Sequence, residues 1–307
     1  MEKRKPYLVN KAFNSFLLAS LLTVAATQVG ATIDGMMLSY WVDTQAMSRV
    51  NITRPGTQVM FALGMTLGAG SSMLAGVAIG NRKRSVANGY FSVAVVSVVA
   101  VGLLMLLAGI GWLPLMVRML CGEETLQGVT SDFLGVMLYG SVFYLLSITL
   151  EMFVTVDGDP RRVSWAVVVS SCSNLLLDYV FIVHCGWGVS GAAWATVISY
   201  GVAVLMLLPH FLKPGTLRFS LRDLAGKWGP AVTAGLPFGL ATLLIAVQLW
   251  ANNNIMMRYF GQSGIVAMSV CVYLLCLSMI ILSGTLKAFQ PVASILKGAG
   301  DGSGVLM

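Results

Sequence analysis

Long apolar stretches alternate along this chain with short polar segments. Crossing the hydrocarbon core of a bilayer as a helix takes about 20 apolar residues. Eight stretches reach that length, and the cleanest, YFSVAVVSVVAVGLLMLLAGIGWL, contains no charged residue. The pattern predicts spans at residues 12–38, 53–79, 87–111, 128–154, 162–183, 188–210, 233–257 and 264–290. The chain is therefore predicted to be an all-α, multi-pass membrane protein with eight helices.

The polar segments between these stretches indicate the orientation of the protein. Cytoplasmic loops carry an excess of Lys and Arg. If Lys287 is counted near the cytoplasmic side, 15 of the 19 basic residues fall on the side that holds the N-terminus. The other side holds Arg49, Arg54, Arg118 and Arg258. We expect a protein of the cell membrane with a cytoplasmic N-terminus.

Composition and motifs reduce the number of functions that this chain is expected to have. Hydrophobic residues make up 57% of the chain and charged residues 10%, against about 25% charged in soluble proteins. The net charge of +7 reflects the loops and does not indicate nucleic-acid binding. Neither a metalloprotease motif nor a nucleotide-binding Gly-rich loop is present. We expect no enzyme, no cofactor and no ATP, so any pumping has to use an ion gradient.

Polar side chains inside the apolar stretches are the candidate functional residues. An ionisable residue within a span costs roughly 2.5–3.5 kcal/mol, which makes it a functional hypothesis. Asp34 lies in the first stretch, and Asn174 and Asp178 lie four residues apart in the fifth. That spacing puts both side chains on one helix face. Carboxylate and amide oxygens together suit a proton or a hard cation.

The organisation of the chain suggests two lobes. We predict an N-terminal lobe of six helices at 1–210, a basic cytoplasmic linker at 211–229, and helices seven and eight at 230–307. A shift of 220 residues aligns the first two helices with the last two. The matched pairs include Gln28 with Gln248 and Asp34 with Asn254. Parallel repeats of this kind are typical of transporters, and on that reading the second lobe is unfinished, with two helices of six.

The central run carries a family resemblance. It contains Asp157-Gly158-Asp159-Pro160, then Asn174-x-x-x-Asp178, then Gly188-x-x-Gly191-Ala192-Ala193-x-Ala195-Thr196. These motifs resemble the multidrug and toxic compound extrusion (MATE) transporters, in the bacterial and archaeal branch whose cation site lies in the N-terminal lobe. The resemblance covers nearly the whole chain and implies a MATE-like six-helix lobe followed by the start of a second one.

The resemblance also implies a site. Its cation- or proton-coupling residues correspond here to Asp34, Asn174, Asp178 and Thr196, which are also the expected ligands if the ion is Na⁺. From helix lengths, Asp178 and Thr196 each lie roughly 8–13 Å below the outer surface. Glu151 and Gln28 are further candidates. Lys287 is expected to line the second lobe or, preferably, to snorkel towards the cytoplasm.

The function these features favour is secondary active efflux of small organic compounds, cationic and lipophilic, in exchange for H⁺ or Na⁺. Membrane lipids are the other expected partners. One alternative is a flippase for lipid-linked oligosaccharides from the same superfamily, which should have a more basic cavity. Another is a truncated remnant that does not transport, because two helices of a second lobe cannot bury their inward-facing polar groups.

Overall fold

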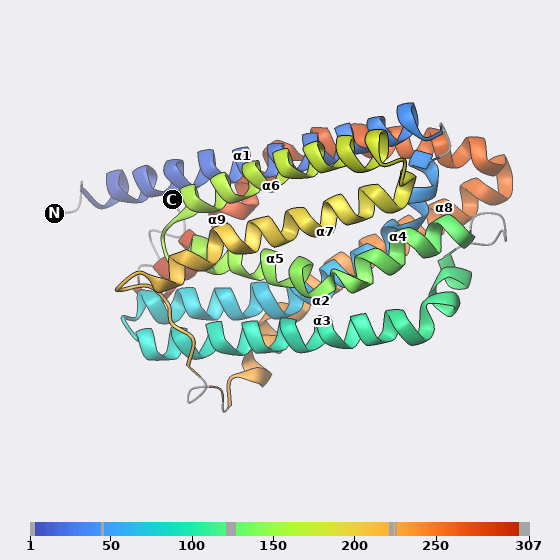
Figure 1. The fold of residues 1–307 in the computed structure, drawn as a ribbon. Coiled ribbons are helices and arrows are strands. Elements are labelled where there is room, and N and C mark those ends of the chain that lie inside the picture. Colours follow the sequence, from blue (N-terminus) through green and yellow to red (C-terminus); the bar gives the residue numbers. More distant parts are fainter. Residues whose placement is uncertain (1–3, 44–45, 121–126, 221–223, 225, 301–307) are drawn as a thin grey trace.

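The structure is a computed structural model that describes residues 4–43, 46–120, 127–220, 224 and 226–300. Helices account for nearly all of this part of the chain (Figure 1). The α-helices are α1 (Arg4–Trp41), α2 (Ala46–Gly80), α3 (Arg84–Leu120), α4 (Gln127–Tyr139), α5 (Ser141–Val156), α6 (Pro160–Asp178), α7 (Gly188–Leu207), α8 (Trp228–Ser278) and α9 (Ile280–Gly298). A π-helical turn, Tyr179–His184, follows α6, and a 3₁₀ turn, Leu208–Leu212, follows α7.

The eight predicted spans match this architecture once two bends are taken into account. Six helices are long and apolar enough to cross a membrane, and the number rises to eight if each of two bent pairs is one span. The predicted fourth span is the pair α4 and α5, bent by 58°. The predicted eighth span is the second part of α8 followed by α9, bent by 49°. The all-α, multi-pass prediction is therefore confirmed.

Glycines explain two features that hydropathy alone did not locate. Gly140 lies at the α4–α5 bend, where a Cβ atom would overlap the side chain of Val197 on α7. Gly261 breaks α8 with φ 62° and ψ −153°, a backbone conformation that only glycine adopts readily. The chain turns back at Gly261 and brings residues 263–278 alongside the first lobe.

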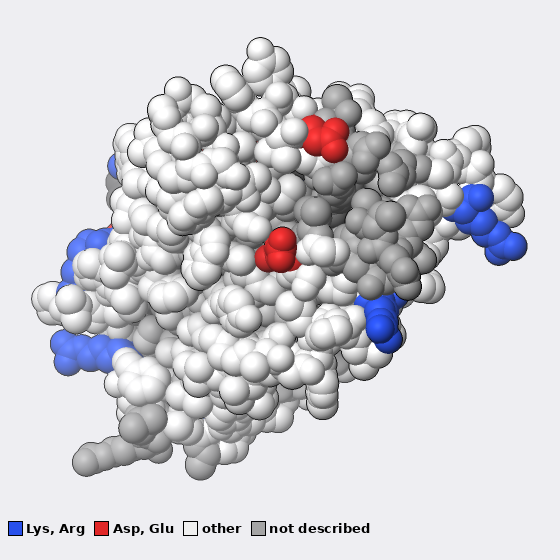
Figure 2. Space-filling model, turned by 45° about the vertical axis from the view of Figure 1, so that its right-hand side comes forward, with Lys and Arg blue, Asp and Glu red and all other residues white. Residues whose placement is uncertain are grey.

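The helices of the first lobe form a ring that is completed by the second lobe. α1 packs on α6, α6 on α7, α7 on α5, α5 on α3, and α3 on α2. α1 and α2 make little contact with each other; α9 packs against both of them, and α8 lies along α2. Figure 1 shows α1 beginning and α9 ending on the same side of the bundle. The face in Figure 2 is mostly covered by uncharged side chains, as a surface in contact with lipid requires.

The two lobes approach closely along α2 because glycines remove the side chains that would keep them apart. A Cβ atom at Gly235 of α8 would overlap the carbonyl oxygen of Thr66 on α2. A Cβ atom at Gly298 of α9 would overlap the carbonyl oxygen of Val77. Small residues at such positions let membrane helices pack backbone to backbone.

The linker predicted at 211–229 is docked on the first lobe over its described first half. Phe211 stacks on Phe91 with ring centroids 4.5 Å apart, and Leu217 is fully buried. The backbone N–H of Leu217 donates to Asp157 Oδ2 at 3.0 Å, and that of Ser220 donates to Ser92 Oγ at 2.7 Å. Residues 221–223, 225 and 301–307 of the predicted linker and second lobe lie outside the described residues.

Candidate functional site

Asp178 is the most deeply buried acidic residue of the candidate site. It is the last residue of α6, directly before the π-helical turn, and its exposed fraction is 0%. Within the described residues, no N–H or hydroxyl group donates a hydrogen bond to either of its carboxyl oxygens. Burying a polar group without a partner costs free energy, and burying an unpaired charge costs far more. π-helical turns are rare in proteins, and those that occur are often found at functional sites.

Asp34 reaches Asp178 from α1. Gly30, Asp34 and Leu38 are spaced by four residues, which puts them on one face of α1. That face points into the lobe, because Leu38 is fully buried and a Cβ atom at Gly30 would lie 3.7 Å from Ser171 of α6. The carboxyl groups of Asp34 and Asp178 are close enough to interact directly. Oδ1 of Asp34 is also buried without a hydrogen-bond partner.

Two neutral oxygen-bearing side chains lie next to this pair. Asn174 is one helical turn before Asp178, and its Nδ2 lies 3.5 Å from Oγ1 of Thr196 on α7. The Thr196 hydroxyl donates to the carbonyl oxygen of Ala192 at 2.9 Å and accepts from Asn174, which leaves one of its two lone pairs for another partner. Asp34, Asp178, Asn174 and Thr196 together offer carboxylate, amide and hydroxyl oxygens from three helices, a donor set that hard cations prefer.

The two further candidates lie away from the Asp34–Asp178 pair. Glu151 of α5 pairs instead with Lys287 of α9, with Oε2 and Nζ 3.1 Å apart. We expected Lys287 to extend its side chain towards the cytoplasm. Its ammonium group instead pairs with a carboxylate of the other lobe. Gln28 is half-buried on α1, six residues and so roughly 9 Å along the helix from Asp34.

Sequence reasoning missed two residues near the site. Arg54 was predicted only as an outer-side residue at the start of the second span; it lies in α2 and within electrostatic range of Asp34. Tyr200 of α7 lies within electrostatic range of both Asp34 and Glu151, and its ring is 4.9 Å from that of Tyr144. Tyr200 follows Thr196 by four residues, so the helical period could have indicated it.

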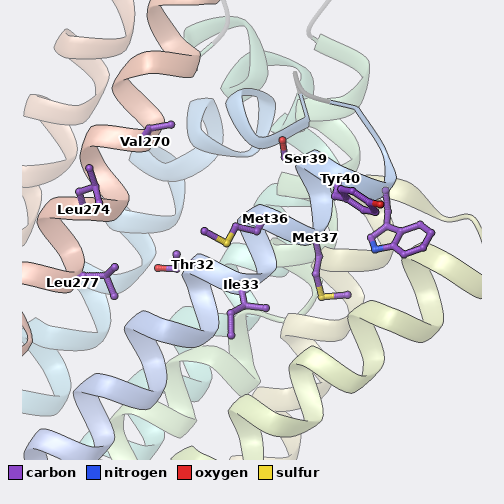
Figure 3. A pocket seen from close by; sticks show the side chains of 10 residues that line it. Thr32, Ile33, Met36, Met37, Ser39, Tyr40, Val270, Leu274 and Leu277 are labelled. Carbon is purple, nitrogen blue, oxygen red and sulfur yellow. The ribbon is translucent and has the colours of Figure 1, made fainter.

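An apolar groove lies along the outer part of α1, and none of the four site residues lines it. Its volume is about 740 Å³, and its lining comes from two segments that belong to different lobes. Figure 3 shows the methionine, Thr32 and Ile33 side chains of α1 on one side and Val270, Leu274 and Leu277 of α8 on the other. Met36 and Met37 follow Asp34 on the same helix, and flexible methionines suit ligands of varied shape.

No group of three or more His, Cys, Asp or Glu side chains that could hold a metal ion occurs within the described ranges. The chemistry of the site is that of two neighbouring carboxyls in a medium of low dielectric constant. Charging both of them without a counter-ion is unfavourable, so a proton or a small cation between them would relieve the repulsion.

Comparisons with known proteins agree with the fold. The MatE family model matches residues 19–180. The "Multidrug export protein MepA" of Staphylococcus aureus is 21% identical over 287 residues, covering 92% of this chain and 64% of the relative. The "Probable multidrug resistance protein YoeA" of Bacillus subtilis is 24% identical over 216 residues, covering 69% of this chain and 46% of the relative. The chain thus spans less than two thirds of the length of these curated relatives.

Solved structures match over almost the whole chain. The MATE multidrug transporter DinF-BH, solved as a complex with a bound compound, has a TM-score of 0.87 at 22% identity, covering 94% of this chain and 66% of the other. A MOP superfamily transporter from Pyrococcus furiosus, described as having a binding pocket of reverse polarity, has a TM-score of 0.87 at 21% identity. It covers 97% of this chain and 67% of the other. At these identities the likeness shows the fold alone.

Proposed function

Because the chain belongs to the MatE family, we propose that it provides the ion-coupling lobe and part of the second lobe of a secondary multidrug efflux transporter. The transported compounds would be small, organic, lipophilic and cationic. The observation that carries the proposal is the Asp34–Asp178 pair, in which three buried carboxyl oxygens receive no hydrogen bond from an N–H or hydroxyl group of the part of the chain that the structure describes. Two buried carboxyl groups side by side do not stabilise a fold, so we infer that they have a role in binding.

The proposed mechanism is competition at this pair. When the site holds neither ion nor proton, its negative charge attracts an organic cation into the first lobe. A proton or Na⁺ that binds at Asp34 and Asp178 removes that charge and releases the organic cation. Asn174 and Thr196 would contribute neutral oxygens to Na⁺ and are dispensable for a proton. The donor set suits both ions, so the choice between them is left to experiment.

Movement of the lobes would complete the cycle. The lobes pack tightly at Gly235 and Gly298, towards the end that the basic residues mark as cytoplasmic. The groove between α1 and α8 lies towards the opposite end. Rocking of one lobe against the other about such contacts is how transporters built from repeats alternate their access. At the end with the groove the lobes are in contact as well, through the buried hydrogen bond between Asn51 of α2 and Ser269 of α8.

The flippase alternative is not favoured. It required a basic cavity, whereas the buried groups around Asp178 are acidic, and the named curated relatives are multidrug exporters. A transporter family also agrees with the expectation that the protein is no enzyme.

The proposal is tested by ion competition in binding. The purified 307-residue chain in lipid nanodiscs is titrated with tetraphenylphosphonium, a permanent lipophilic cation, at several values of pH and Na⁺ concentration. We expect the apparent Kd to rise as pH falls or as Na⁺ rises, and Asp34→Asn and Asp178→Asn each to remove that dependence. Binding that depends on neither ion would contradict the proposed coupling.

A further inference from the structure

One ion pair joins the two lobes inside the membrane-spanning part of the fold. Lys287 Nζ of α9 lies 3.1 Å from Glu151 Oε2 of α5. The exposed fraction is 16% for the Glu151 side chain and 37% for that of Lys287. The carboxylate is therefore set into the first lobe, and the ammonium group covers it from the side of the second lobe.

The depth of the pair explains why Lys287 needs this partner. Lys287 precedes the end of α9 at Gly298 by eleven residues, or roughly 16 Å along the helix. The ammonium group is therefore held by Glu151 well before the helix ends. Glu151 precedes the end of α5 at Val156 by five residues, or roughly 8 Å. A charge at such depth is paired or faces a water-filled cavity.

Two tyrosines lie within electrostatic range of the same carboxylate. Tyr144 and Tyr200 both lie within electrostatic range of Glu151, and their ring centroids are 4.9 Å apart. Tyr144 is on the same helix as Glu151, seven residues earlier, which is two turns along one face. A carboxylate together with tyrosine rings is the arrangement that binds organic cations, through charge and through the faces of the rings.

We propose that Lys287 is a built-in counter-cation for Glu151, and that an organic cation displaces it there. Glu151 then forms a second cation-binding position, separate from the Asp34–Asp178 pair. This inference rests on the proposed function in one respect, namely that the chain binds organic cations. It names Lys287 as the residue that sets how strongly they bind at Glu151.

The exchange has a consequence for the lobes. Replacing one cation by another leaves the net charge around Glu151 unchanged, so the carboxylate never becomes an unpaired buried charge. Because Lys287 belongs to α9 and Glu151 to α5, the incoming cation breaks a contact between the lobes. Binding at Glu151 thereby loosens the second lobe from the first.

Affinity for matched ions tests the proposal. Tetraphenylphosphonium and its isosteric anion tetraphenylborate are titrated into the 307-residue chain in nanodiscs. We expect Lys287→Gln to bind the cation roughly tenfold tighter than the unmodified chain, since the competing ammonium group is gone and a partly buried pair contributes on that order. Glu151→Gln should bind it more weakly, because Lys287 is left unpaired, and the double variant should lie between the two. Tetraphenylborate should not gain affinity in Lys287→Gln.

Lys297→Gln is the matched control. Lys297 is exposed on the same helix near its cytoplasmic end, so this variant makes the same change of charge without touching Glu151. Equal cation affinities in the Lys287→Gln and Lys297→Gln chains would overturn the proposal. So would an equal gain for both tetraphenyl ions, because that indicates a larger cavity and not an unmasked carboxylate.

Thermal unfolding gives a readout that does not need a ligand. Lys287→Gln and Glu151→Gln should each lower Tm, and the double variant should recover most of the loss; additive losses would overturn the pairing. The two proposals also fail separately. If Na⁺ or acid competes with tetraphenylphosphonium but Lys287→Gln changes nothing, this inference is wrong and the proposed coupling stands. If Lys287→Gln tightens binding while neither ion competes, the coupling is wrong and the role of Lys287 stands.

Discussion

Replacing Asp178 with Asn should stabilise the protein while it removes ion coupling. Asp178 is fully buried, and both of its carboxyl oxygens lack hydrogen-bond partners. Each unsatisfied buried group costs about 1–3 kcal/mol, and an amide is cheaper in the membrane than a charge. The Asn side chain also places an N–H donor beside Asp34. We expect a gain of about 2 kcal/mol.

The gain should depend on the ion that normally occupies the site. Large domains shift in Tm by about 2 °C per kcal/mol, so Asp178→Asn should raise Tm by about 4 °C at high pH without Na⁺. The difference should shrink at low pH or at high Na⁺, because the bound proton or ion then relieves the same repulsion in the unmodified chain. Thermal unfolding in nanodiscs, followed by tryptophan fluorescence, measures this.

Asp132→Asn is the control for this substitution, because Asp132 is exposed on α4; its Tm should change by less than about 1 °C. The reasoning is refuted if Asp178→Asn lowers Tm under all conditions. It is also refuted if the variant keeps the full effect of pH and Na⁺ on tetraphenylphosphonium binding.

Three further substitutions test other parts of the structure. Gly235→Val should destabilise the protein by about 1–3 kcal/mol, because its side chain meets the Thr66 backbone; Gly229→Val, where a Cβ atom meets nothing within 4 Å, should cost less in the same unfolding assay. Asp157→Ala should speed tryptic cleavage at Arg218, because Asp157 accepts from both His210 and the Leu217 N–H; an unchanged cleavage rate would show that the linker is held by other contacts. Thr196→Val should weaken Na⁺ competition by roughly tenfold while leaving acid competition intact, since only a metal ion needs the hydroxyl oxygen; equal effects on both would exclude Thr196 as a ligand.

Hydropathy predicted the spans well because lipid imposes one strong requirement on every helix that crosses the membrane. It could not predict the bend at Gly140, since that bend depends on the approach of Val197 from a helix 57 residues later. The break at Gly261 is similar: a glycine in an apolar region is compatible with both a continuous helix and a turn. Boundaries within apolar regions are set by tertiary packing, which the pattern does not contain.

The candidate site was predictable where local spacing determines it. Asn174 and Asp178 share a helix face because of their separation, Asp34 is an ionisable residue in an apolar stretch, and the resemblance supplied Thr196. The partners of Glu151 and Asp34 were not predictable in the same way. Hydropathy gives the depth of a residue but not the rotation of its helix about its own axis. Only the packed structure therefore shows that Lys287 faces Glu151 and that Arg54 lies near Asp34.

The central claim is that Asp34 and Asp178 together hold the coupling ion, and infrared difference spectroscopy tests it most directly. Spectra of the purified chain are recorded with and without tetraphenylphosphonium, at low pH and, separately, at high Na⁺. We predict that the organic cation changes a carboxyl band, through loss of a proton or release of Na⁺, and that this change is absent in both Asp34→Asn and Asp178→Asn. A carboxyl signal that persists unchanged in both variants would place the coupling ion elsewhere and contradict the account.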